Sequence, residues 1–164
     1  MSVTDDKVCD TAAPDQSRAQ RRAAMAVLAQ AQADDIAHGL SLVGDDVDFA
    51  ELRPAEIGLV MLRARIGGDG APFNVGEATV TRAAVQIASG ETGFGYVLGR
   101  DRRKAALVAL CDALWQADAY RRRVEQYVLA PLRYVQQERR GTARAQTAAT
   151  RVDFFTLVRG EDDR

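Results

Sequence analysis

The residues of this sequence that could do chemistry together are arginines, a carboxylate and hydroxyl groups in the middle of the chain. Arg63 and Arg65 precede a glycine-rich break, and Glu77 and Thr79 follow it, each pair at a spacing of two. An arginine fork binds a phosphate-like anion or a carboxylate through two parallel hydrogen bonds. The pattern therefore predicts a ligand- or partner-facing polar surface, which is either a small-anion site or a charged sheet face covered by solvent or a partner. This predicted surface comprises Arg63, Arg65, Glu77, Thr79, Arg82 and Arg100.

No recognisable catalytic pattern accompanies this surface. His38 is the sole histidine, and Cys9 and Cys111 stand far apart without a C-x-x-C pair, so no metal site is expected. The sequence lacks the G-x-S-x-G elbow of hydrolases and the P-loop of nucleotide-binding proteins. The glycines over residues 93–99 have the wrong spacing for a dinucleotide fingerprint and instead predict an edge strand close to another backbone. The catalytic residues are therefore left unassigned.

Charge and composition narrow the class of protein. The 164 residues include 22 basic and 23 acidic side chains, which give a net charge of −1. A dedicated nucleic-acid binder usually carries a clear basic excess, so no nucleic acid is expected as a partner. No run approaches the roughly 20 apolar residues that span a bilayer, and no apolar leader follows a basic start. We therefore expect a protein of the reducing cytoplasm without membrane contact.

The polar surface requires a sheet to position it. Residue types alternate with a period of two over residues 59–66, 73–88 and 93–99, which predicts three strands. Only short turns separate them, without a helix-length crossover, so an antiparallel β-meander is predicted. The alternation places Glu77, Thr79 and Thr81 side by side on one face, within reach of an arginine pair across the ladder. Arg82 lies on the other face.

Helical spacing of apolar residues flanks the predicted sheet on both sides. Residues 17–43 predict an N-terminal helical pair, and the period changes to 3.6 again after the expected N-cap Asp101. Pro131 is expected to kink or divide the C-terminal helical segment. The predicted fold class is therefore α+β, with an N-terminal helical pair, an antiparallel β-meander and C-terminal helices packed on the sheet.

The two ends of the chain differ from this central part. Residues 1–15 are polar, acidic and aperiodic, which predicts a mobile tail before a single domain over residues 16–160; residues 161–164 form a C-terminal tail. The run at 151–160 is short, aromatic and typical of a strand. Phe154, Phe155 and Leu157 within it predict either a core strand or a partner-binding segment, because contiguous exposed apolar side chains usually mark interfaces.

Several blocks of the sequence are familiar as a set. They are RPAEIGLV at 53–60, NVGEATVTRAAV at 74–85, GYVLGRD at 95–101, ALCDAL at 109–114, LAPL at 129–132 and VDFFTLVRG at 152–160. Together they resemble the PhnG family, the G subunits of the bacterial carbon–phosphorus lyase core complex. The resemblance covers residues 17–160 in order, and residues 1–15 lie outside it.

This resemblance implies a subunit of alpha-D-ribose 1-methylphosphonate 5-triphosphate synthase. Such a subunit works with PhnH-, PhnI- and PhnJ-type subunits and with the ATP-binding-cassette proteins PhnK and PhnL. The complex transfers the ribose triphosphate of ATP to a phosphonate and releases adenine, and the displacement is attributed to the I subunit. The implied chain binds no cofactor, has ATP only as a substrate of the complex and is inactive alone. A structural adaptor for the I subunit and a stand-alone small-anion-binding module stay open as alternatives.

Overall fold

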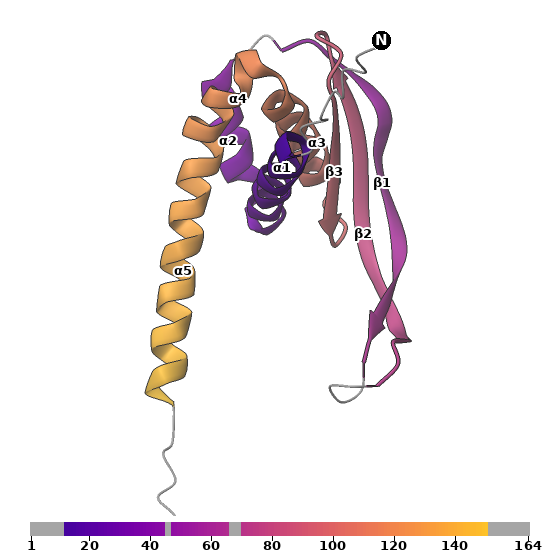
Figure 1. The fold of residues 1–164 in the computed structure, drawn as a ribbon, viewed down its shortest axis with the longest axis vertical. Coiled ribbons are helices and arrows are strands. Elements are labelled where there is room, and N and C mark those ends of the chain that lie inside the picture. Colours follow the sequence, from indigo (N-terminus) through magenta and orange to yellow (C-terminus); the bar gives the residue numbers. More distant parts are fainter. Residues whose placement is uncertain (1–11, 45–46, 66–69, 151–164) are drawn as a thin grey trace, which may run out of the picture.

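A computed structural model describes residues 12–44, 47–65 and 70–150 of the chain (Figure 1). α1 begins at Ala12, ahead of the predicted domain boundary at residue 16. The run with Phe154, Phe155 and Leu157 lies outside the described residues. The elements are α1 (Ala12–Gln30), α2 (Ala33–Val43), β1 (Phe49–Ala64), β2 (Phe73–Ile87), β3 (Thr92–Leu98), α3 (Arg102–Gln116), α4 (Asp118–Val124), the π-helical turn η1 (Glu125–Leu129) and α5 (Ala130–Ala149).

The strands form an antiparallel meander in the order β1–β2–β3. The helices gather on one side of this sheet, with α3 packed against β2 and β3 (Figure 1). β1 and β2 continue past the end of β3 as a two-stranded arm, made by residues 73–79 of β2 and their partners on β1. α5 extends in the same direction as this arm (Figure 1). The predicted α+β fold, with its helical pair, meander and C-terminal helices, is confirmed.

The core lies between the sheet and α3, and two glycines of β3 set how closely they approach. A Cβ atom built on Gly93 would lie 2.0 Å from the carbonyl oxygen of Ala109, and one on Gly95 would lie 1.9 Å from that of Ala105. The predicted contact of this glycine-rich strand with another backbone is therefore confirmed. The largest fully buried side chains around it are Leu28, Ile36, Val43, Val85, Val97, Val108, Leu114, Val124, Val128 and Leu129.

A buried carboxylate ties α1, α3 and β3 together. Asp112 is 2% exposed and accepts hydrogen bonds from Arg21 at 2.8 and 2.6 Å and from the backbone N–H of Phe94 at 2.8 Å. The hydrogen bond to Asp112 raises the pKa of Arg21, although burial opposes the shift. One turn later, Gln116 donates to the carbonyl of Thr92 at 2.8 Å. Side chains of α3 thus occupy backbone groups that this end of β3 does not use for pairing.

The path from α3 into α5 passes through the π-helical turn η1. Pro131 lies in the first turn of α5, directly after η1. Proline has no N–H to donate to the carbonyl four residues earlier, that of Tyr127, and its ring would clash there in a regular helix. The wider π turn accommodates the mismatch. The backbone thus stays helical from α4 into α5, with the irregularity confined to the π turn before Pro131; a kink or division at Pro131 stays a prediction.

The Glu125 side chain links the π-helical turn η1 to α3. Its carboxylate accepts hydrogen bonds from the indole of Trp115 at 2.8 Å and from Arg133 at 2.6 Å. Arg121 lies over the Trp115 ring, 4.9 Å from its centroid. Burial raises the pKa of Glu125, but the hydrogen bonds from Arg133 and Trp115 outweigh it, so the pKa falls below the ordinary 4.5.

We expect Glu125→Gln to lower the free energy of unfolding by about 1 kcal/mol at neutral pH, because the carboxylate is partly exposed and screened. A group whose pKa is lower in the folded state stabilises the protein above its unfolded-state pKa. That stability is lost as the pH falls through the folded pKa. Urea denaturation of both proteins should therefore show a constant difference above about pH 4.5 that shrinks in more acidic buffer. A difference independent of pH would show that the variant lost only packing.

Candidate functional site

The register of the sheet assigns each predicted polar residue to a side. Glu77, Thr79 and Thr81 share the helix-facing side of β2, as predicted, with Met61, Leu59 and Ile57 opposite them on β1. Thr81 is buried, and its hydroxyl donates to the carbonyl of Gly99 at 2.7 Å. Thr81 is therefore part of the core, whereas Glu77 lies exposed and Thr79 half-buried on the arm.

The arginines do not join these residues. A β-bulge lies opposite Leu62 and Arg63, with Val75 as the extra residue on β2, so Arg63 pairs with Asn74 at the outer end of the arm. No hydrogen bond or ion pair between Arg63 and Glu77 or Thr79 forms among the described residues. Arg65 lies beyond the end of β1 and donates to the carbonyl of Gly70 at 3.4 Å. Arg100 follows β3 and is exposed. The structure thus distributes the predicted polar surface over both sides of the sheet.

The side of the sheet that none of the described helices covers, here called the open face, has Arg82 near its centre. Arg82 lies between Glu56 on β1 and Tyr96 on β3 in the register of the three strands. It donates to the Glu56 carboxylate at 2.7 Å, and a guanidinium nitrogen of Arg53 lies 3.6 Å from the same carboxylate. Sequence reasoning missed Arg53 and Glu56. The alternation of β1 around residue 56 was the available signal, but the predicted strand began only at residue 59.

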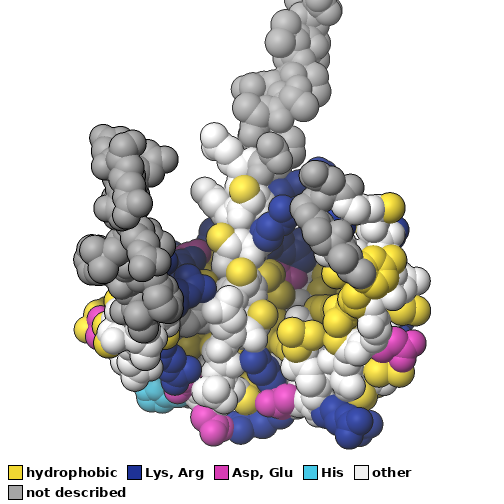
Figure 2. All heavy atoms as spheres, turned by 90° about the horizontal axis from the view of Figure 1, so that it is seen from below, with side chains coloured by type: hydrophobic (Ala, Val, Ile, Leu, Met, Phe, Trp, Pro, Cys, Tyr) yellow, Lys and Arg dark blue, Asp and Glu magenta, His cyan; other side chains and the backbone are white. Residues whose placement is uncertain are grey.

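Large apolar side chains remain exposed on the arm. Leu59 and Met61 lie on its helix-facing side, together with Ile57 just before the arm on β1, and Phe73 and Val75 lie at the outer end of β2. Their exposed fractions range from 39% to 64%. Figure 2, which views the molecule from below, shows apolar side chains gathered on the right over this end of the sheet. Contiguous apolar surface of this kind usually marks a protein–protein interface.

Comparisons with known proteins show the family of this chain. The family described as phosphonate metabolism protein PhnG matches residues 19–160. The chain belongs to the PhnG family. The matched range includes Phe154, Phe155 and Leu157, whose partner-binding role stays a prediction. One relative, from Rhizobium meliloti (strain 1021), is named alpha-D-ribose 1-methylphosphonate 5-triphosphate synthase subunit PhnG. It is 47% identical over 144 residues, which cover 88% of this chain and 92% of the relative.

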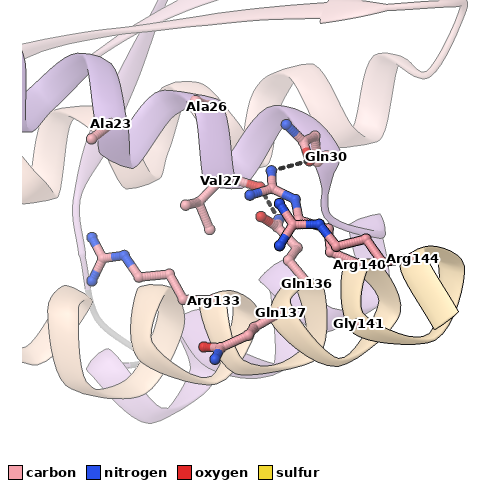
Figure 3. A pocket seen from close by; sticks show the side chains of 10 residues that line it. All are labelled: Ala23, Ala26, Val27, Gln30, Arg133, Gln136, Gln137, Arg140, Gly141 and Arg144. Carbon is pink, nitrogen blue, oxygen red and sulfur yellow. Dashed lines mark hydrogen bonds between the residues drawn. The ribbon is translucent and has the colours of Figure 1, made fainter. Parts of the chain in front are cut away.

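A groove of about 680 Å³ lies between α1 and α5 of this PhnG-family chain (Figure 3). Its polar groups largely hold the two helices together. Gln136 donates to the carbonyl of Val27 at 2.7 Å, and Arg140 donates to the side chain of Gln30 at 3.1 Å. Arg133, at one end of the groove, is bound to Glu125. We therefore interpret these contacts as structural: they hold α5 against α1 and fix its direction.

The described part of the PhnG-family chain offers little for chemistry of its own. No three His, Cys, Asp or Glu side chains come together there as a metal site. His38 is exposed on α2, and burial raises the pKa of the Cys111 thiol far above its ordinary value, which makes it unreactive. None of the described helices has the length and apolar character to cross a membrane. What the described residues do offer is apolar and arginine-bearing sheet surface suited to binding protein.

Proposed function

We propose that the chain is a subunit of an alpha-D-ribose 1-methylphosphonate 5-triphosphate synthase within a carbon–phosphorus lyase core complex. The observation that carries this proposal is the 47% identity to a protein of that name over 88% of the chain. The large apolar side chains left exposed on the sheet agree with it, because a chain that works alone rarely exposes so many.

The proposed reaction transfers the ribose triphosphate of ATP to a phosphonate. A phosphonate oxygen forms a bond to C1′ of the ribose as the C1′–N9 bond breaks. The bonding electrons leave with N9 of adenine, which takes up a proton from the medium. The products are adenine and the ribose 1-phosphonate 5-triphosphate, with the triphosphate intact. ATP is thus a substrate of the complex, and the chain itself needs no cofactor.

In this proposal the chain assists a reaction centre on companion subunits. PhnH-, PhnI- and PhnJ-type subunits and the PhnK- and PhnL-type ATP-binding-cassette proteins are the proposed partners, in the cytoplasm. The exposed apolar side chains of β1 and β3 support this division of labour, because such surface usually marks an interface. The polar positions on the arm, Arg63, Glu77 and Thr79, are then partner- or ligand-facing, as are Arg65 and Arg100 beyond the strands.

The proposal predicts that adenine release depends on this chain. The companion subunits would be assembled with and without it, and adenine formed from ATP and methylphosphonate would be followed by liquid chromatography. We expect formation of adenine only when the chain is present, and none from the chain alone. Adenine formation at an equal rate without the chain, or no complex with the companion subunits, would contradict the proposed function.

A further inference from the structure

The open face carries a hollow of about 500 Å³ at its centre. Ala84 of β2, only 8% exposed, lies on its floor. Phe94 and Tyr96 of β3 line it on one side, and Leu52 and Arg53 of β1 line it on the other. We call this the open-face hollow; Arg82 also lines it. Its volume falls in the range of sites that hold a ligand or an anchoring side chain.

In the described part of the chain, the core does not include the apolar side chains at the rim of this hollow. On β3 the residues that face α3 are Gly93, Gly95 and Val97, all buried. The alternate residues Phe94, Tyr96 and Leu98 point to the open face and are 55%, 50% and 75% exposed. Leu52, across the hollow, is 55% exposed. Exposed aromatic side chains beside arginines are the composition of interface hot spots.

The charges around the hollow are unbalanced among the described residues. Arg53 and Arg82 share the single carboxylate of Glu56, and all three side chains are about half exposed. One carboxylate leaves a surplus positive charge, so the surface is complementary to an acidic partner. Guanidinium groups are weakly hydrated and bind carboxylates through paired hydrogen bonds, which suits them to a desolvated interface.

The neighbouring edge of β3 does not offer an equivalent site. At Thr92 and Phe94 the backbone groups of the edge already bind Gln116 and Asp112 of α3. A strand that tried to pair with β3 beside the hollow would have to displace both side chains. At Thr92 and Phe94 a partner is therefore better accommodated by side-chain contacts with the face of the sheet than by backbone pairing with its edge.

We propose that the open-face hollow is a docking site for a protein segment with an apolar side chain next to a carboxylate. The apolar side chain inserts between Leu52 and Phe94, and the carboxylate binds Arg53 and Arg82. The occupant is a companion subunit of the synthase, and in this respect the inference rests on the proposed function. The contact gives this face of the sheet a cover that the described residues do not supply.

Affinity for the assembled PhnH-, PhnI- and PhnJ-type subunits tests the docking site. We expect the double variant Phe94→Ser with Tyr96→Ser to raise the dissociation constant of the full chain at least about tenfold. Arg53→Glu with Arg82→Glu should have a similar effect, because it turns the surplus positive charge negative and repels the partner carboxylate. All four side chains are about half exposed, so both double variants should fold.

Matched controls lie on α5. Tyr134→Ser removes an aromatic side chain that is 67% exposed, and Arg139→Glu reverses an exposed charge. Thermal unfolding followed by circular dichroism shows whether each variant is folded. If the double variant of Phe94 and Tyr96 is not folded, the dissociation constant of the double variant of Arg53 and Arg82 tests the docking site. Binding by both open-face variants as tight as that of the controls would overturn the docking site alone. A wild-type chain that binds none of the subunits would overturn the proposed function and this inference with it.

Sedimentation velocity of the chain alone completes the test. Self-association that both open-face variants abolish, together with unchanged binding of the companion subunits, would identify a second copy of this chain as the occupant and overturn the proposal. A wild-type chain that stays monomeric while it binds the companion subunits through this face would support it.

Discussion

Replacement of Gly95 by alanine is expected to destabilise the protein by about 3 kcal/mol or more, or to prevent folding. The new Cβ would lie 1.9 Å from the carbonyl oxygen of Ala105 and 2.8 Å from its carbonyl carbon. These are backbone atoms in the first half of α3, which cannot rotate away as a flexible side chain can. To admit the methyl group, α3 would have to move off β3 and open the core between them. Chemical denaturation measures the loss.

Glycines in the neighbouring strands provide the control for this substitution. A Cβ built on Gly58 of β1 or Gly76 of β2 meets nothing within 4 Å. Gly58→Ala and Gly76→Ala should therefore change the free energy of unfolding by less than about 0.5 kcal/mol. A Gly95→Ala variant as stable as these two would show that α3 lies farther from β3 than described here.

The order of the elements was predictable because it depends on short-range patterns. Alternation over 73–88 and 93–99, with the 3.6 period after Asp101, predicts a meander followed by helices, and Asp101 does cap α3 through the N–H of Lys104. The glycine spacing of β3 also indicated a close backbone neighbour. The sequence could not show which backbone it was, since that depends on packing between segments.

The arrangement of the candidate site residues was less predictable, because it depends on the pairing register between β1 and β2. An unbroken register would pair Arg63 with Val75, and the bulge in β2 pairs it with Asn74 instead. Nothing in the local residue pattern indicates a bulge at that position. Irregularities also occur between Glu51 and Glu56, where β1 carries Arg53 to the open face. The grouping of Arg53, Glu56 and Arg82 follows from pairing across strands that the sequence alone does not specify.

The sequence indicated that the Asp112 side chain would be buried, but it did not show which group would bind it. It falls at helical intervals among apolar residues such as Val108 and Trp115, where a charged side chain needs a partner. That partner, Arg21, lies in α1, 91 residues away in the chain. A contact of this separation is set by tertiary packing, so the ion pair was visible only in the structure.

Removal of this carboxylate should have the second large effect. We expect Asp112→Ala to lower the free energy of unfolding by about 3 kcal/mol. The substitution leaves the N–H of Phe94 without its acceptor and Arg21 without its counter-charge. The Arg21 side chain is 36% exposed, so water compensates part of the loss, and the estimate lies at the lower end for a buried pair. Denaturation in urea at neutral pH measures the effect.

Two exposed aspartates of the same chain are controls that separate the effect of burial from the effect of losing a charge. Asp34 and Asp118 also pair with arginines, but their side chains are 85% and 94% exposed. Asp34→Ala and Asp118→Ala should cost less than about 0.5 kcal/mol, because water solvates both partners once the pair is broken. Asp112→Asn should fall between these values and Asp112→Ala, since its amide oxygen can still accept from Phe94. Equal losses at Asp112 and Asp34 would contradict a buried tie between α1, α3 and β3.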